Sequence, residues 1–292
     1  MDIIFARHGK IMYGALLALA FLRQQQHLGI NNETLLIAGG LVLLFGIPHG
    51  AADTLIFRTI GGHRGFLGWV LFGFIYLLMA VAIYGLWLWS PPFFLGYLLL
   101  ISVIHFGEDL HEIPHRWMKL SYGLAVVFSP ALIWQSEVSV LYGFIVENQV
   151  AILFAKISNI IAWISLANLA LISFAFRGAI SSENYFYLIW PITTLLILEP
   201  LLGFSLYFGL WHSRLHLNRL TILQILDRKP ISMLLLAVPL VITIAAAFYG
   251  FIRLGGITDL SFSRIIFIGL GSLTFPHLFM VHALNSLDYR RG

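Results

Sequence analysis

The stretch that decides the fold class is FLGWVLFGFIYLLMAVAIYGLWLW, residues 66–89, which carries no charged side chain. A helix of about 20 apolar residues is long enough to cross the hydrocarbon core of a bilayer. Residues 151–176 and 231–252 are further long apolar runs of this kind. Backbone groups in lipid must be hydrogen-bonded internally, and the sequence lacks the ten-residue alternating segments of a barrel. These runs therefore predict membrane-spanning helices.

Composition supports the same fold class. Of the 292 residues, 60% are hydrophobic and only 10% are charged, whereas soluble domains carry roughly 25% charged residues. The chain has no cysteine, which excludes a disulfide framework and a thiolate metal site. The net charge of +4 fits an excess of Lys and Arg in cytoplasmic loops and does not indicate a nucleic-acid partner. The expected fold is an all-α, polytopic helix bundle integral to the cell membrane.

The apolar runs divide the chain into about eight to ten predicted spans, because the breaks at Pro91-Pro92 and Glu199-Pro200 are weak. The candidate helices are residues 11–22, 34–57, 66–89, 93–110, 120–135, 151–176, 185–199, 200–217, 231–252 and 262–283. We expect one transmembrane domain over residues 1–292. In it, residues 1–30 add a short extra helix and residues 34–290 form a helical core that binds a metal.

The distribution of basic residues predicts the orientation. With ten spans and the N-terminus inside, 13 Lys and Arg residues lie on the inner side and 4 on the outer side. The outer residues are Arg23, Lys156, Arg253 and Arg264. Cytoplasmic loops are enriched in Lys and Arg, so both termini are expected to be cytoplasmic.

Five histidines lie inside predicted spans, where ionisable side chains are costly and mark function by default. They occur in Gly46-Ile-Pro-His49-Gly-Ala-Ala-Asp53, His105-Phe-Gly-Glu-Asp109, Trp211-His212-Ser-Arg-Leu-His216 and Thr274-Phe-Pro-His277. Each segment runs from outside to inside in the charge-derived topology, and each histidine precedes a cytoplasmic basic residue by a few turns or less. The five imidazoles are therefore expected at one depth, in the inner half of the bundle.

The spacing of these histidines favours a metal site. His212 and His216 are four residues apart, so both leave one helix face and can bind one metal ion. A lone histidine in a bundle is more often a hydrogen-bonded packing residue than a ligand, but five at one depth favour the metal. Imidazole suits iron, copper, zinc and nickel, and the spacing does not choose among them.

Two aspartates have the same four-residue relation to histidines, Asp53 to His49 and Asp109 to His105. A metal-bound histidine usually donates its other ring N–H to a carboxylate, a carbonyl or water, which fixes its tautomer and orientation. We therefore expect these two carboxylates to orient the metal-binding imidazoles.

Together, the motifs resemble those of the Brp/Blh family of membrane β-carotene 15,15′-dioxygenases. The resemblance covers about residues 40–290 and consists of Pro-His49-Gly-x-x-Asp53, His105-Phe-Gly-x-x-Asp109, Trp-His212-x-x-x-His216 and Pro-His277, in that order. The N-terminus departs from the pattern, because family members often begin close to the first Pro-His-Gly. The resemblance implies an all-helical membrane enzyme that uses non-haem Fe(2+) and O₂ to cleave the central double bond of β-carotene into two molecules of retinal.

The resemblance also implies roles for individual residues. The residues that match the family's catalytic iron ligands are His49, His105, His212 and His216. His277 matches the late Pro-His and is expected beside the ligands, in contact with a ligand or the substrate. The electron-rich polyene would supply the electrons, so no reducing co-substrate is expected.

A carotenoid dissolved in the bilayer needs a site that opens sideways to lipid. A long rod cannot lie wholly within a compact metal pocket, so we expect a tunnel lined by aromatic and aliphatic side chains. The aromatic residues predicted nearest the metal are Phe106, Phe208, Trp211 and Phe275. The expected partners are therefore β-carotene or a related carotenoid, O₂ and membrane lipid.

Two other functions compete with this interpretation. A membrane di-iron desaturase or hydroxylase commonly needs about eight histidines in polar segments, and only five candidates lie inside spans here. A metal-ion transporter needs ionisable groups through both leaflets, but the outer halves of these helices carry almost none apart from Glu199. An opsin is disfavoured because no late helix has a lysine in mid-span.

Overall fold

The computed structural model describes residues 47–61, 65–110, 115–177, 182–223 and 260–291, together with parts of 14–24, 38–44 and 225–237. Every regular element within these residues is helical, which confirms the all-α prediction. The main elements are α3 (Ile47–Ala51), α4 (Asp53–Gly61), α5 (Phe66–Trp89), α6 (Pro91–Gly107), η2 (Glu108–Leu110), α7 (Arg116–Phe128), α8 (Pro130–Ile133), α9 (Gln135–Gly143), α10 (Asn148–Ala175), α11 (Ser182–Ile197), α12 (Pro200–Leu206), η3 (Tyr207–His212), α13 (Ser213–Ile222) and α15 (Leu260–Arg291).

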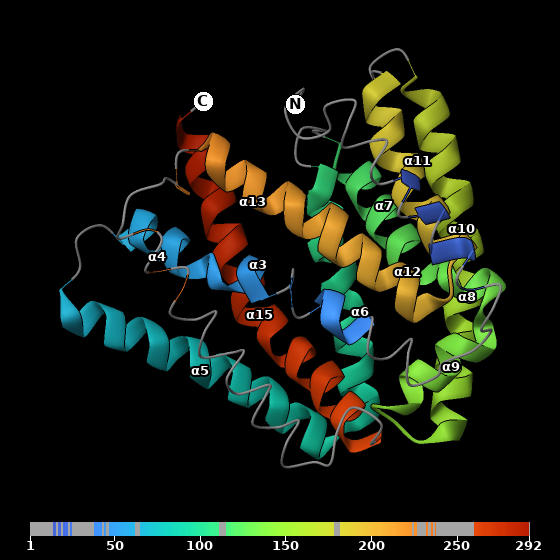
Figure 1. Cartoon of the computed structure of the whole chain (residues 1–292), viewed down its shortest axis with the longest axis horizontal. Helices are drawn as coiled ribbons and strands as arrows, with labels where there is room; N and C mark the ends of the chain where they lie inside the picture. Colours follow the sequence, from blue (N-terminus) through green and yellow to red (C-terminus); the bar gives the residue numbers. More distant parts are fainter. Residues whose placement is uncertain are drawn as a thin grey trace.

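Four helical segments of the described chain are long and apolar enough to cross a membrane. They are Phe66–Trp89, Pro91–Leu110, Asn148–Ala175 and Phe267–Ser286. Helix α5 has Ala80 as its buried residue and exposes many other apolar side chains, such as Phe74, Leu78 and Leu88, as expected for contact with lipid. The chain is thus a membrane helix bundle (Figure 1). The predicted run 231–252 lies largely outside the described residues and the run 11–22 is described only in part, so the number of spans and the side of the termini stay predictions.

Proline positions explain two of the boundaries between helices. The predicted boundary between residues 185–199 and 200–217 is confirmed, since α11 ends at Ile197 and α12 begins at Pro200. The predicted helix 120–135 is divided where α7 ends at Phe128 and α8 begins at Pro130. Proline has no N–H to donate and is tolerated in the first turn of a helix, so each proline begins a new helix.

Two other predicted helices depart from regular α-helix close to the histidines. The predicted helix 34–57 is interrupted at Ala52, between α3 and α4. The predicted helix 200–217 contains η3, a π-helical segment that ends at His212, and the Ser213 hydroxyl donates to the Phe208 carbonyl five residues back at 2.7 Å. Such π-helical turns are rare and often occur at functional sites.

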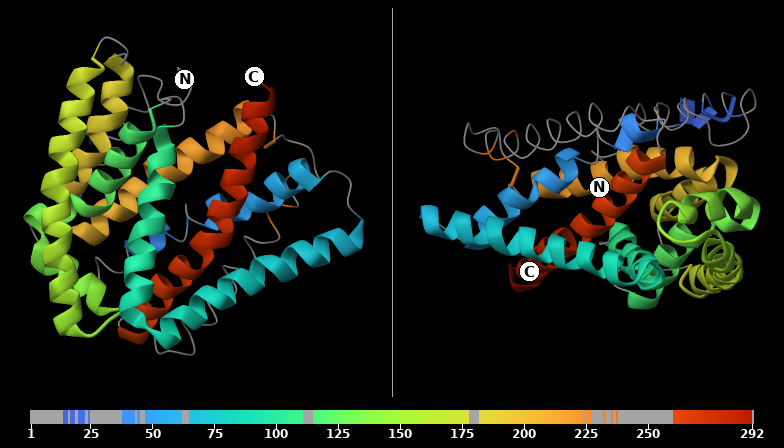
Figure 2. Two further views of the ribbon diagram at one scale, coloured as in Figure 1. Left: turned by 180° about the vertical axis from the view of Figure 1, so that it is seen from behind. Right: turned by 90° about the horizontal axis from the view of Figure 1, so that it is seen from below.

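Helix α15 lies at the centre of the bundle, with α5 on one side and α6 on the other (Figure 1). Helix α15 contacts α5 and α6 and crosses between them, as Figures 1 and 2 show. On the other side of α6, helix α7 packs against α6 and α10. Helices α5 and α9 therefore lie on opposite sides of α6 (Figure 1).

Glycine residues allow α6 and α7 to approach closely. A Cβ atom added to Gly123 of α7 would overlap the carbonyl oxygen of Val103 on α6. A Cβ atom on Gly107 would lie 2.8 Å from the carbonyl oxygen of Lys119. Small residues at such contacts let the backbones of membrane helices meet, and here they hold the end of α6 that carries His105 against α7.

The Gly123→Ala variant is therefore expected to destabilise the fold by about 1–3 kcal/mol or more, because α6 and α7 must separate to admit one methyl group. The measurement is the thermal unfolding of purified protein in detergent. Gly85→Ala is the matched control, since nothing lies within 4 Å of a Cβ atom at that position on α5. Equal unfolding temperatures for the two variants would show that the close contact is not needed.

Candidate metal centre

The structure brings the five histidines of the predicted spans together inside the bundle. His49 comes from α3, His105 from the last turn of α6, His212 from the end of η3, His216 from α13 and His277 from α15. All five are buried, with at most 9% of their surface exposed. Segments separated by more than 200 residues thus meet at one point.

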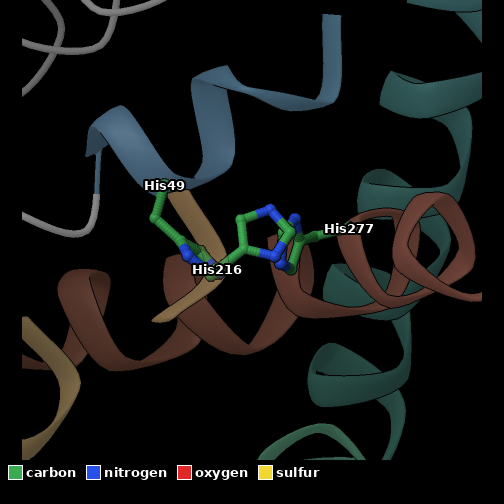
Figure 3. Close-up of side chains that lie close together, drawn as sticks. All are labelled: His49, His216 and His277. Atoms are coloured by element: carbon green, nitrogen blue, oxygen red, sulfur yellow. The ribbon is translucent and has the colours of Figure 1, made fainter. Parts of the chain in front are cut away.

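His49 lies at the centre of the cluster. Its ring centroid is 4.4 Å from that of His216, 4.5 Å from that of His277 and 4.8 Å from that of His212. His105 is 5.8 Å from His49 and 4.5 Å from His212. Figure 3 shows His49, His216 and His277 pointing toward one another from different elements. Both histidines of the four-residue pair, His212 and His216, therefore reach His49.

The free nitrogen atoms of the cluster fit a metal ion. Two groups, His49-His105-His212 and His49-His216-His277, each offer three ligand atoms within 4.8 Å of one another. The buried ring nitrogens without a hydrogen-bond partner are His49 Nδ1, His49 Nε2, His105 Nδ1, His216 Nε2 and His277 Nε2. Buried polar atoms normally have partners, and coordination would supply a partner for one nitrogen of each ring here.

The distance between two nitrogens supports the same assignment. His105 Nε2 and His212 Nε2 are 2.9 Å apart. Metal–imidazole bonds are about 2.0–2.1 Å long, so two nitrogens on one ion at a right angle lie about 3 Å apart. The pair therefore already has the separation of two ligands on one metal.

Asp109 orients His212. The Asp109 carboxylate lies 2.6 Å from His212 Nδ1 and accepts a hydrogen bond from the Tyr207 hydroxyl at 2.7 Å. A carboxylate accepts, so Nδ1 carries the proton and Nε2 keeps its lone pair toward the cluster. The expected pairing of Asp109 with His105 is wrong. Helix α6 ends at Gly107, and the tighter turn of η2 directs Asp109 toward another element.

Asp53 orients His277 in the same manner. Its carboxylate lies 2.9 Å from His277 Nδ1 and accepts the Tyr76 hydroxyl at 2.8 Å. The expected pairing of Asp53 with His49 is wrong, since neither ring nitrogen of His49 has a hydrogen-bond partner. The interruption at Ala52 places Asp53 in the first turn of α4, where it meets α15.

Two tyrosines of the site carry no sequence signal of their own. Tyr76 and Tyr207 sit in apolar runs that read as ordinary membrane helix. Aromatic side chains are common in such runs as interfacial or packing residues, so periodicity does not single them out. Only the contacts with Asp53 and Asp109 identify them.

A cavity of about 610 Å³ adjoins the histidines, a size typical of small-molecule sites. Its lining includes His49, His105 and His277. The remaining walls are mainly apolar and include residues of α5, on one side of α6, and of α9, on the other. An elongated apolar molecule is therefore the kind of ligand that this space suits.

The four aromatic residues predicted for the tunnel divide into two pairs. Phe106 and Phe208 line the cavity. Trp211 and Phe275 lie outside the lining, contrary to expectation. Trp211 is fully buried and packs against Tyr187 at 5.4 Å between ring centroids. Phe275 is 37% exposed, because it precedes His277 by two residues, which is about 200° around a helix.

Comparison with known proteins places the chain in a family. Residues 40–285 match the family described as beta-carotene 15,15'-dioxygenase. A curated protein named beta-carotene 15,15'-dioxygenase, from an uncultured marine bacterium 66A03, is 30% identical over 253 residues, which cover 82% of this chain and 90% of that protein. No solved structure matches the chain. The matched range contains all five clustered histidines, and the chain belongs to the beta-carotene 15,15'-dioxygenase family.

Proposed function

We propose that this protein is a multi-pass enzyme of the cell membrane that cleaves the central double bond of β-carotene with O₂, giving two molecules of retinal. The observation that carries the proposal is the buried cluster of imidazoles with free nitrogens on the wall of an apolar cavity. Membership of the family and the name of the curated relative support the reaction.

The ligands in this proposal are His49, His105, His212 and His216, which hold one Fe(2+) ion. A bound non-haem ferrous ion would supply the redox chemistry with O₂ that cleavage of a carbon–carbon double bond requires. The chain's contribution is to orient the imidazoles, through Asp109 in the case of His212, and to exclude water from them. All four are at least nine-tenths buried, which shields the centre from bulk solvent.

Positioning of the polyene sets which bond is cut. The cavity lining includes Ala80 on α5 and Val138 on α9 as well as His49 and His105, and α5 and α9 lie on opposite sides of α6 (Figure 1). Such a space holds the two halves of a symmetrical rod on either side of the histidines. Holding the central bond there in one orientation contributes to the rate and fixes the site of cleavage.

Access from the lipid phase fits the exposure of the cavity walls. Leu77 of α5 and Leu273 of α15 both line the cavity, and they are 63% and 45% exposed on two neighbouring spanning helices. An apolar substrate dissolved in the bilayer therefore has a route to the histidines that does not cross water.

The direct test combines metal analysis with product analysis. Protein purified in detergent is expected to contain one iron per chain and to convert β-carotene under air into two equivalents of retinal, with no product under argon. Protein that binds no metal, or that forms no retinal after iron loading, would overturn the proposal. The desaturase alternative has less support, because the described residues gather five histidines rather than eight.

Alanine at either carboxylate tests the orientation of the ligands. We expect Asp53→Ala and Asp109→Ala each to lower iron occupancy or activity by roughly 10–100-fold, as for other residues that hydrogen-bond to the histidines of a metal site. Asp109 holds the ligand His212, and Asp53 holds His277, whose ring packs against the ligand His49. Insertion into the membrane should be unchanged and serves as the control, measured as the yield of monodisperse protein. Full activity in both variants would show that the carboxylates only pack.

A further inference from the structure

His277 lies within the metal cluster rather than behind it. Its ring centroid is 4.5 Å from that of His49, 5.0 Å from that of His105 and 5.4 Å from that of His216. These distances match the separations among the four proposed ligands. With His49 and His216 it forms one of the two groups whose ligand atoms lie within 4.8 Å of one another (Figure 3).

The hydrogen bond to Asp53 prepares His277 for coordination. Because the carboxylate accepts from Nδ1, the opposite nitrogen, Nε2, keeps its lone pair. Nε2 is buried and has no hydrogen-bond partner, and His277 is 5% exposed. A histidine that acted only through hydrogen bonds would leave this acceptor unsatisfied, which costs about 1–3 kcal/mol.

The surroundings of His277 repeat those of a proposed ligand. Tyr207 donates to Asp109, which accepts from His212, and Tyr76 donates to Asp53, which accepts from His277. The two Tyr–Asp–His chains come from different helices, so the likeness is not a consequence of local sequence. In both, Nδ1 faces a carboxylate, which leaves Nε2 as the nitrogen available to a metal.

We infer that His277 is a fifth imidazole ligand of the metal centre, positioned by Asp53 and Tyr76. The inference rests on the proposed metal site and extends its ligand set. Asp53 then acts on the metal through His277. Tyr76 also lines the cavity, so the substrate space adjoins the hydrogen-bond chain that holds this ligand.

The test uses His277→Asn, because the asparagine amide can replace Nδ1 as the donor to Asp53 but has no atom in the place of Nε2. Apo-protein is loaded with Co(II), whose d–d absorption reports the number and type of ligands, and affinity is measured by chelator competition. We expect an altered spectrum and an affinity at least about 10-fold weaker, since even partners behind a ligand contribute 10–100-fold. His282→Ala, an exposed histidine on the same helix, is the matched control.

A second variant, His277→Gly, tests the inference if the His277→Asn protein does not fold. In His277→Gly, added imidazole should enter the vacated space and restore the Co(II) spectrum. Loss of the fold is recognised by thermal unfolding of the metal-free protein. A wild-type spectrum and wild-type affinity in His277→Asn, or no response to imidazole in His277→Gly, would exclude His277 as a ligand and leave the other four untouched. Wild-type protein that binds no metal would instead overturn the proposed function.

Discussion

The His212→Ala variant is expected to lose most of its iron and at least about 100-fold of its retinal-forming activity, because residues behind a ligand already contribute 10–100-fold. His212 Nε2 lies 2.9 Å from His105 Nε2, so its removal breaks a close pair of candidate ligand atoms. It also takes from the buried Asp109 one of its two hydrogen-bond donors. A buried carboxylate that loses a donor is costly to keep ionised.

Iron content by elemental analysis and retinal by chromatography measure this effect. His282→Ala is the control, because His282 is exposed on α15 and outside the cluster, and it should behave as wild type. A His212→Ala protein with normal iron and normal turnover would show that His212 is not needed to hold the metal.

Ala80→Trp is expected to lower β-carotene cleavage by about 100-fold while iron content stays at the wild-type level. Ala80 is 7% exposed and lines the cavity on α5, and an indole there fills space that one half of the polyene needs. Displacement of a bound substrate by about 1 Å can cost 10²-fold in rate. Normal iron content in this variant shows that the histidines are undisturbed.

The same helix supplies the control for this prediction. Ala82 is exposed and lies about 200° around α5 from Ala80, so Ala82→Trp faces away from the cavity and should keep full activity. On α9, Val138→Trp and Val140→Trp form an equivalent pair, since Val138 lines the cavity and Val140 is 52% exposed. Wild-type cleavage in both Ala80→Trp and Val138→Trp would mean that the substrate does not occupy this cavity.

Local patterns predicted the long helices well. The run 66–89 is α5, with the same bounds. The run 151–176 lies in α10 apart from its last residue, and the run 262–283 lies within α15. A bilayer imposes length and polarity on each span separately, so composition along the chain contains the needed information. The interruption of the predicted helix 34–57 at Ala52 was not predicted, because alanine is the strongest helix former and does not signal a break.

The candidate site was predictable in its residue types but not in its pairings. Histidine inside a membrane span is unusual enough to draw attention to His49, His105 and His277 from sequence alone. The four-residue spacing then suggested that each aspartate serves the histidine on its own helix. In the structure each aspartate holds a histidine of a distant segment. Asp53 holds His277 of α15, and Asp109 holds His212 of η3.

What the sequence determined by itself was the helical membrane fold and the set of buried histidines, because both follow from the cost of polar groups in lipid. The tertiary structure decided which nitrogens face one another and which carboxylate holds which ring. Those contacts depend on how far each helix is rotated about its axis. The rotation is set by packing, such as the contact of Gly123 of α7 with the backbone of α6. Local changes at η2 and η3 rotate side chains further, and periodicity along one helix contains no information about its neighbours.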